Sequence, residues 1–395
     1  MSVMKRIRQL GAAALIIAFC AGCSGVPPEE ISAREVSIIK IIKPNYIPDF
    51  SGIVNEFSEI NSDLQVRFVD APLSTGERHQ LYVSALSGKD ESIDLYWVND
   101  EWTEEFAKEG YILPIDNEIP TDGGSYIIDA KEMFSYNNGL YALPIGLDMD
   151  FVFFRKDMIK QSSENWDEII AECRRSDLQL PLALCVENSD AKDMLCNIAE
   201  IKNSKGCSYS EALNIYKEII SDNIDADNMP IDYVSVFKTG NASMLIGNAA
   251  FWRKLNHNTS AVRGNVDMGR LPGEESSYIR GYGLAVNINS KNKEAALRFL
   301  DFMNSKKSQE NLSRECSVMP VIESLYDDDM IIDANPYIKN IKDIVKNTPA
   351  YKNLKISGEE LKQAEEAIIK YFNNEETAEN TGRTLEILLT KRKEN

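Results

Sequence analysis

Two tryptophans lie beside hydrogen-bonding side chains where a short apolar segment gives way to a polar one. Leu95–Val98 is apolar and predicts a buried strand, and Trp97, Asn99, Asp100 and Trp102 lie within it or directly after it. Flat aromatic faces next to oxygen atoms suit a sugar, because a pyranose has an apolar face and a rim of hydroxyl groups. A core role for both tryptophans and a capping role for Asn99 or Asp100 explain the same residues. The sequence leaves both interpretations open.

The elements that must position these side chains alternate between strand and helix. Ser37–Ile42, Leu64–Val69 and Asp94–Val98 predict strands, while Ile53–Ile60 and residues 74–87 predict helices. This order with short connections predicts a parallel sheet flanked by helices. Ligands of such sheets bind beyond the carboxyl ends of the strands, which is where we expect the polar side chains after residue 98 to lie.

Two acidic residues form a second candidate group. The Asn-Gly pair at 138–139 predicts a hairpin turn, and Leu140–Pro144 and Phe151–Arg155 predict strands joined by a loop that holds Asp148 and Asp150. Paired carboxylates near aromatic rings also describe a glycoside hydrolase. On a loop, nothing fixes the separation of Asp148 and Asp150. The chain offers no second convincing catalytic acid and no nucleophile motif, so we expect no enzymatic activity.

The later part of the chain predicts further strands with aromatic residues close to them. Ala242–Gly247, Val266–Arg270 and Gly281–Ile288 read as strands, and Lys293–Met303 predicts an amphipathic helix before a helical C-terminal third. Trp252 and Tyr282 lie close to strand ends, where a large aromatic side chain has little core to fill. Both are therefore candidates for ligand contact.

Charge and cysteine content exclude several classes of partner. The chain of 395 residues has 43 basic and 62 acidic residues and a net charge of −19, which is unsuited to nucleic acid. With two histidines and no Cys-x-x-Cys pair, no zinc site and no cofactor are expected. Free thiols and one disulfide remain alternatives for the cysteines that follow the N-terminal segment. These cysteines are Cys173, Cys185, Cys196, Cys207 and Cys316.

The N-terminus predicts export. Basic residues near the start precede the apolar run Gly11–Phe19, which is short for a bilayer span, and Ala21-Gly22-Cys23 follows. The segment resembles a bacterial lipoprotein signal. That resemblance implies a signal peptide at 1–22, a lipid on Cys23 and a tether at 23–35 that anchors the protein to the outer face of the cell membrane. Cys20 stands where the pattern usually has Leu, so simple secretion stays an alternative.

An ordered set of motifs resembles the extracellular solute-binding proteins of bacterial ABC importers, in the branch that takes maltose, trehalose and other oligosaccharides. The set comprises Ser74-Thr75-x-x-Arg78-His79, Asn99-x-x-Trp102, Leu140-Tyr141-Ala-Leu-Pro144 with Asp148, Phe154-Arg155-Lys156-Asp157, Gly240-Asn-Ala-Ser-Met244 with Trp252, and Gly281-Tyr-Gly-Leu-Ala. Three positions depart from the family pattern. Asn99 replaces the usual Asp, Arg280 replaces a usual Gly, and Ile322 departs from the pattern just after Pro320.

The resemblance implies a two-lobe, periplasmic-binding-protein-like α/β fold with a three-strand hinge and C-terminal helices. One lobe would comprise residues 36–146 plus 283–320, and the other residues 147–282 plus 321–395. The hinge crossings are expected near Gly146, Gly281 and Pro320.

The resemblance also implies a carbohydrate ligand held between the lobes of a monomer that docks on membrane permease subunits. The implied ligand-binding residues are Thr75, Arg78, Trp97, Asn99, Trp102, Asp148, Asp150, Trp252, Gly281 and Tyr282. Two alternatives stay open from the residues alone. The partner could instead be a sensor kinase, and acids beside aromatics also suit a cationic ligand such as a polyamine.

Overall fold

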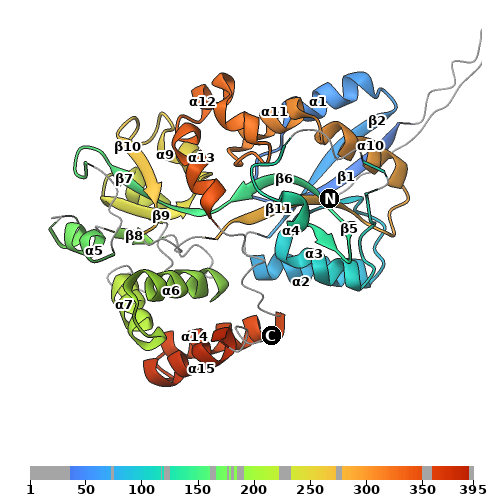
Figure 1. Ribbon diagram of the computed structural model, residues 1–395. Coiled ribbons are helices and arrows are strands. Elements are labelled where there is room, and N and C mark those ends of the chain that lie inside the picture. Colours follow the sequence, from blue (N-terminus) through green and yellow to red (C-terminus); the bar gives the residue numbers. More distant parts are fainter. Residues whose placement is uncertain are drawn as a thin grey trace, which may run out of the picture. The chain divides into compact units, whose positions relative to one another are not determined.

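Two larger β-sheets, a two-stranded sheet and the surrounding helices make up the part of the chain that the structure describes (Figure 1). This computed structural model describes residues 36–390 apart from 73–74, 117, 120–124, 161–165, 176–177, 179–181, 185–190, 222–232, 273–277 and 349–357. All described residues belong to one compact unit, Val36–Asn395. The expected signal peptide, the tether and Cys23 lie outside the described residues.

The first sheet has the strand order β2-β1-β3-β11-β6. Its strands are β1 (Ser37–Pro44), β2 (Leu64–Ala71), β3 (Leu95–Asn99), β6 (Leu143–Asp148) and β11 (Arg280–Val286). β1 runs parallel to β2 and β3, whereas β11 runs antiparallel to both β3 and β6. The predicted parallel arrangement of the first three strands is confirmed, as β-branched and aromatic residues favour the pleated, buried position they occupy.

Helices cover this sheet through their apolar faces. They are α1 (Ser51–Ile60), α2 (Thr75–Ser87), α3 (Asp100–Lys108), α10 (Lys293–Met303) and α11 (Lys306–Cys316). Phe57 of α1 packs edge-on against Phe299 of α10 with ring centroids 5.0 Å apart, so the two helices share one core. The bounds of α10 agree with the sequence prediction, because the 3.6-residue apolar period is unbroken there.

A short helix and a hairpin follow. α4 (Ala130–Met133) precedes β4 (Ser135–Tyr136) and β5 (Gly139–Leu140), which pair antiparallel. The two turn residues are Asn137 and Asn138, both with positive φ, so the predicted turn at 138–139 is wrong by one position. Asparagine tolerates the left-handed region well enough to fill both central positions of such a turn.

The predicted loop around the two acids is also wrong. Asp148 is the last residue of β6 and Asp150 is the first residue of β7 (Asp150–Arg155), with only Met149 between them. Asp148 is paired in register with Arg280, and Asp150 with Asn248. The chain therefore passes from the first sheet to the second through one residue, which fixes both carboxylates on strands.

The second sheet has the order β10-β7-β9-β8 and is buried on both faces of β7. Its other strands are β8 (Leu182–Leu184), β9 (Met244–Asn248) and β10 (Val266–Arg270). Phe151 and Phe153 join the main core, whereas Val152 and Phe154 join a second apolar cluster. Alternate side chains of a strand point to opposite faces, so β7 links the two cores.

The remaining helices surround the second sheet or follow it in the chain. They are α5 (Trp166–Arg175), α6 (Ala191–Lys205), α7 (Tyr209–Ser221), α8 (Tyr233–Lys238), α9 (Phe251–Leu255), the 3-10 helix η1 (Glu323–Asp327), α12 (Asp329–Ala334), α13 (Ile338–Asn347), α14 (Gly358–Phe372) and α15 (Ala378–Thr390). α14 and α15 lie beside α6 and α7, and the buried Ala364 and Ile368 of α14 pack into the second cluster (Figure 1).

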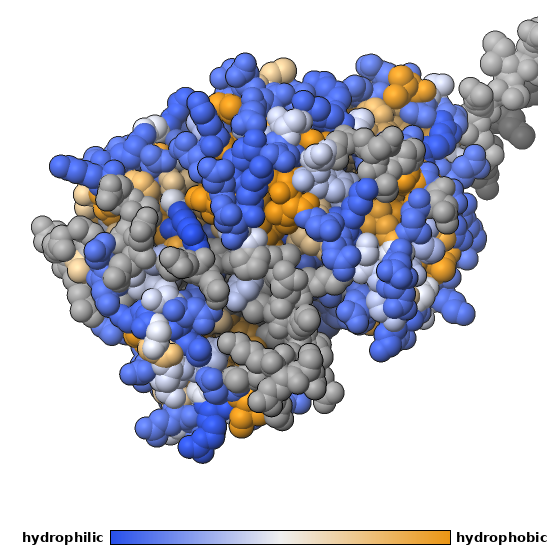
Figure 2. Space-filling model, in the orientation of Figure 1, coloured by the Kyte–Doolittle hydropathy of each residue, from blue (hydrophilic) through white to orange (hydrophobic). Residues whose placement is uncertain are grey.

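Apart from the residues drawn in grey, the face in Figure 2 is mostly hydrophilic, with apolar areas between the hydrophilic ones. Among the described helices, none combines the length and the apolar composition that a bilayer span requires. Cys207 and the buried Cys316 are free thiols, while the side chains of Cys173, Cys185 and Cys196 lie outside the described residues.

Candidate functional site

A buried tyrosine–aspartate pair joins the two central strands of the candidate site. The hydroxyl of Tyr282 in β11 donates to Oδ2 of Asp148 in β6 at 2.8 Å. Tyr282 is 8% exposed and Asp148 is 6% exposed. Burial, and then the nearby Asp148 carboxylate, raise the pKa of Tyr282 well above its usual value, because both disfavour a phenolate. The phenol therefore stays neutral and acts as a donor at physiological pH.

An arginine lies between the two acids. Nη2 of Arg280 is 3.7 Å from Oδ2 of Asp148 and 3.3 Å from Oδ1 of Asp150. Arg280 begins β11 directly opposite Asp148 in the strand register, so the backbone pairing places the guanidinium there. The arrangement gives two carboxylates held by one cation at the point where the chain changes sheet.

The backbone next to Arg280 is packed without a side chain. Gly281 donates its N–H to Oδ1 of Asp100 at 2.9 Å. A Cβ on Gly281 would lie 2.9 Å from the ring of Phe134, closer than real Cβ contacts. Gly281, predicted as a ligand residue, thus has a steric reason to be glycine. The predicted cap of α3 is not seen on Asn99, whose side chain makes no capping hydrogen bond.

A second tyrosine approaches from the loop after β1. Its hydroxyl oxygen, on Tyr46, is 3.5 Å from that of Tyr282. Lys43 anchors this loop by donating to the carbonyl of Ile47 at 2.7 Å and pairing with Asp49 at 2.9 Å. Burial is the main cause that raises the pKa of Tyr46, while the positive charge of Arg78 lowers it in part.

Arg78 connects the start of α2 to this tyrosine. The side chain is 1% exposed and donates to the carbonyl of Pro72 at 3.1 Å and to Oγ1 of Thr75 at 3.2 Å. Its guanidinium carbon is 5.8 Å from the ring centroids of both Tyr46 and Trp102. A guanidinium between two aromatic faces is stabilised electrostatically, so three predicted residues, Thr75, Arg78 and Trp102, form one contiguous group.

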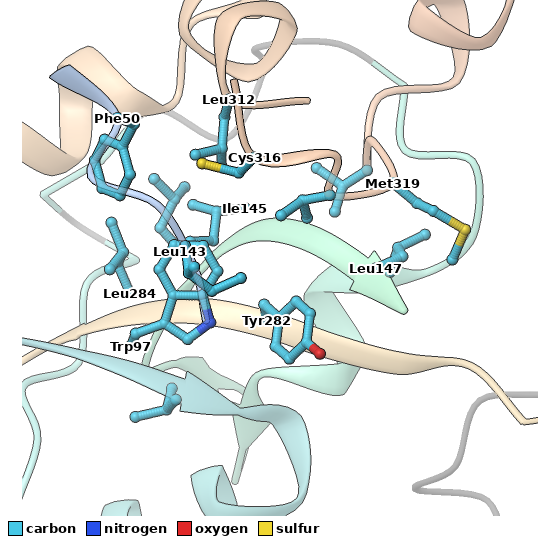
Figure 3. Close-up of a cluster of buried hydrophobic side chains, with 14 of the residues drawn as sticks. Phe50, Trp97, Leu143, Ile145, Leu147, Tyr282, Leu284, Leu312, Cys316 and Met319 are labelled. Atoms are coloured by element: carbon cyan, nitrogen blue, oxygen red, sulfur yellow. The ribbon is translucent and has the colours of Figure 1, made fainter. Parts of the chain in front are cut away.

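The predicted tryptophans of β3 and α3 lie in the core. Trp97 is fully buried, with its ring 5.8 Å from Tyr282 and 6.3 Å from Phe50 (Figure 3). Figure 3 also shows the Tyr282 hydroxyl pointing away from Trp97. Trp102 is buried against Tyr82, 5.7 Å between centroids. Trp97 therefore packs against the Tyr282 ring, and Trp102 packs against Arg78.

Two buried polar atoms on the Tyr282 face of the first sheet have no hydrogen-bond partner among the described residues. They are Nε1 of Trp97 and Oδ1 of Asn99, which lies opposite Tyr282 in the strand register. Buried polar groups are nearly always paired, with protein, water or ligand. These two atoms are therefore available to hydrogen-bond a polar ligand or water molecules close to Tyr282.

Trp252 meets a tyrosine from the C-terminal third. Half-buried Trp252 in α9 lies with its ring 5.3 Å from that of Tyr337, next to the start of α13. Tyr337 is buried, and its hydroxyl has no hydrogen-bond partner among the described residues. Burial raises the pKa of Tyr337, and the carboxylate of Asp148 raises it further. Both effects keep the phenol of Tyr337 neutral.

The structure thus groups most of the predicted site residues, with three additions. Four of them lie around the β6–β11 pair, namely Asp148, Asp150, Gly281 and Tyr282. Three more lie at or near the ends of neighbouring strands, namely Thr75, Arg78 and Asn99. Tyr46, Arg280 and Tyr337 were not predicted as site residues. Tyr46 follows a predicted strand, so the rule on carboxyl ends could have found it. No local pattern marks Tyr337.

Chemically, this site offers neutral phenols, paired charges and aromatic faces. No group of three or more metal-ligating side chains occurs among the residues that the structure describes. Phenols and carboxylates bind hydroxyl groups, and aromatic rings cover apolar faces. The arrangement is suited to holding a small polar molecule.

Comparison with known proteins finds relatives and structural neighbours for most of the chain. A putative binding protein of Brucella abortus (strain 2308) is 22% identical over 326 residues, which cover 74% of each chain. A probable ABC transporter-binding protein of Deinococcus radiodurans is 19% identical over 323 residues, covering 72% of this chain and 76% of that protein. The maltose-bound MalE3 of T. maritima has a TM-score of 0.77 at 17% identity, covering 89% of this chain and 99% of that one.

The likeness to MalE3 confirms the predicted periplasmic-binding-protein-like α/β fold. The family model "Bacterial extracellular solute-binding protein" matches residues 43–310, well over half of the chain. The chain therefore belongs to the bacterial extracellular solute-binding protein family.

Proposed function

We propose that this protein is the exported substrate-binding component of an ABC importer and that its ligand is a sugar. Family membership supports the solute-binding role. The name of the Deinococcus radiodurans relative supports the ABC partner, and the maltose in MalE3 supports the ligand class. Family and fold are those of binding proteins, which argues for capture rather than catalysis.

The observation that carries the proposal is the oriented carboxylate of Asp148. Tyr282 and Arg280 both contact its Oδ2, at 2.8 and 3.7 Å. A carboxylate makes stronger hydrogen bonds to hydroxyl groups than a neutral acceptor does. The rings of Trp252 and Tyr337 offer the apolar surface that a sugar face needs. Because these groups are already oriented, ligand binding loses little conformational entropy in ordering their side chains.

The proposed mechanism is closure of two lobes on the ligand. We place one lobe at residues 36–146 plus 283–320 and the other at 147–282 plus 321–395. With these bounds, Asp148 and Asp150 both belong to the second lobe and directly follow the proposed crossing near Gly146. A ligand stabilises the closed form only through contacts that are stronger there, and hinge closure is a common motion of such proteins.

A binding screen tests this proposal. Residues 24–395 are screened by thermal shift and then by calorimetry against maltose, trehalose, longer oligosaccharides and sugar alcohols. Saturable binding with a Kd near micromolar, about 8 kcal/mol, is the expected result. Chromatography of the incubated sugars checks for turnover. Absence of binding across the panel rejects the sugar, and released product rejects a simple carrier.

Lipid anchoring through Cys23 is part of the proposal. The basic, apolar and Ala-Gly-Cys segments of the N-terminus support it. The full chain expressed in a bacterium should partition into detergent with a mass increase on the peptide that begins at Cys23. Cys23→Ser should move the protein to the aqueous phase. Equal partitioning of both forms contradicts the anchor. We further propose that the protein acts as a monomer.

A further inference from the structure

Arg280 occupies a position from which it meets both acids of the proposed site. It is the first residue of β11, and its guanidinium lies within 4 Å of a carboxylate oxygen on each side of the sheet crossing, 3.7 Å from Asp148 and 3.3 Å from Asp150. Its side chain is 17% exposed and those of Asp148 and Asp150 are 9% and 20% exposed. Solvent therefore screens these charges only partly.

The pairing changes what the two acids can recognise. Asp148 and Asp150 are separated along the chain by Met149 alone, and as two bare carboxylates they would attract a cation. Arg280 offsets part of this negative charge, and a second guanidinium, that of Arg78, lies 5.8 Å from the ring of Tyr46. The neighbouring hydroxyls belong to phenols that burial keeps neutral. The two acids are therefore already engaged by a cation, which weakens their attraction for a cationic ligand.

We propose that Arg280 is a specificity-determining residue, which restricts the site to neutral polyhydroxyl ligands by pairing with both Asp148 and Asp150. This inference rests on the proposed ligand site. A diamine would have to displace the guanidinium from two carboxylates or be buried against it. A neutral sugar hydroxyl can instead share the carboxylates with Arg280, because hydroxyl groups both donate and accept. Specificity of this kind comes from the cost imposed on the wrong ligand.

Calorimetry with putrescine as the cationic probe and maltose as the neutral probe tests the role of Arg280. Wild-type protein should give no measurable heat with putrescine. Arg280→Gln should bind putrescine at least about tenfold more tightly than wild type, since a nearby unit charge has been removed from a partly buried site. Arg280→Lys keeps the charge and should still reject putrescine.

Arg298→Gln is the matched control. This arginine pairs with Asp63 at 3.0 Å on the surface of α10, so its loss changes the net charge equally but away from the site. It should leave putrescine binding unmeasurable. Putrescine binding gained equally by both glutamine variants would overturn the inference, because the effect would then be one of total charge. Folded Arg280→Gln protein without a gain would overturn it too.

The complementary variant Asp150→Asn covers the case in which Arg280→Gln does not fold. Asp150→Asn removes one negative charge next to Arg280 and leaves that guanidinium with a single acidic partner, so the variant should bind D-glucuronate at least about tenfold more tightly than wild type does. An unchanged affinity for D-glucuronate overturns the inference. The proposed function fails separately, if wild-type protein binds no member of the sugar panel. Tight putrescine binding by wild type would reject the role of Arg280 whatever the sugars do.

Discussion

Asp148 is held by two donors of different character, a neutral phenol and a cation. The phenol of Tyr282 cannot ionise near neutral pH, because burial and Asp148 itself oppose a second negative charge. Arg280 supplies the positive charge that makes a buried carboxylate tolerable. Side chains behind this group, Trp97 against Tyr282 and Trp102 against Arg78, fix its geometry. The affinity for a ligand should therefore depend on a few residues and not on the whole surface.

Trp252→Ala should weaken binding of a sugar from the panel by tenfold or more, about 1.4 kcal/mol, because an aromatic face is lost. The side chain is only half-buried, so the protein should remain folded by circular dichroism. Trp252→Phe keeps a ring next to Tyr337 and should show an intermediate affinity in calorimetry. If the alanine variant binds as wild type does, Trp252 is not a ligand residue.

Tyr282→Phe should lower the free energy of unfolding by about 1–3 kcal/mol, because it removes a buried donor from Asp148. Tyr326→Phe is a matched control, since it removes a buried 2.9 Å hydrogen bond to the carbonyl of Pro320. Urea unfolding should show a similar loss in both variants. Only Tyr282→Phe should also weaken sugar binding in calorimetry. Equal ligand affinity in the two variants would show that Tyr282 acts on folding alone.

At the scale of elements, β11 connects the site to both of its neighbours in the first sheet. It pairs with β3 and β6, and its register shifts between Tyr282 and Gly283. A Cβ at Gly281 or Gly283 would lie 2.9 or 2.7 Å from the Phe134 ring, so the ring packs directly on the strand backbone. This close packing holds Arg280 and Tyr282 at fixed positions opposite Asp148.

Gly281→Ala should therefore destabilise the protein by about 1–3 kcal/mol, because the new methyl group overpacks against Phe134. Thermal unfolding monitored by circular dichroism measures the loss. In Phe134→Leu the obstructing ring is gone, so adding Gly281→Ala should cost less than it does in wild type. Strictly additive losses would show that the two residues do not clash.

Element boundaries were predicted well where one periodic pattern ran unbroken and less well elsewhere. β10 and α10 have the predicted bounds, because buried residues alternate at Val266 and Met268 in β10 and the apolar period of α10 is unbroken. The strand expected at Leu140–Pro144 instead begins at Leu143 and runs to Asp148. Its extension depends on pairing with β11, which is more than a hundred residues away in the chain. Local patterns do not contain that information.

At the scale of the whole molecule, many tyrosines are buried and neutral. Burial is the largest cause that raises the pKa values of Tyr46, Tyr82, Tyr282, Tyr326 and Tyr337 above 10. For each, the unfolded chain ionises more readily than the folded one. The stability that they contribute is therefore complete below about pH 10, the usual tyrosine pKa, and is lost as the pH rises above it.

The protein should thus unfold cooperatively in alkali, with its free energy of unfolding falling by up to 1.4 kcal/mol per pH unit for each such tyrosine. Absorbance at the phenolate band and near-ultraviolet circular dichroism measure ionisation and tertiary structure together. Both signals should change in one transition above pH 10. Reversible ionisation of all tyrosines near pH 10 with intact tertiary signal would contradict the burial of these groups.

The sequence alone determined the class of the fold, the succession of strands and helices, the family resemblance and several site residues. These follow from local periodicity and from short motifs such as Asn99-x-x-Trp102 and Gly281-Tyr-Gly. Only the tertiary structure decided that Trp97 and Trp102 pack behind the site as core residues. It also decided that Asp148 and Asp150 lie on strands. The same holds for the three added residues, Tyr46, Arg280 and Tyr337. The physical reason is that burial and ion pairing depend on segments far apart in the chain, which meet only when the sheets form.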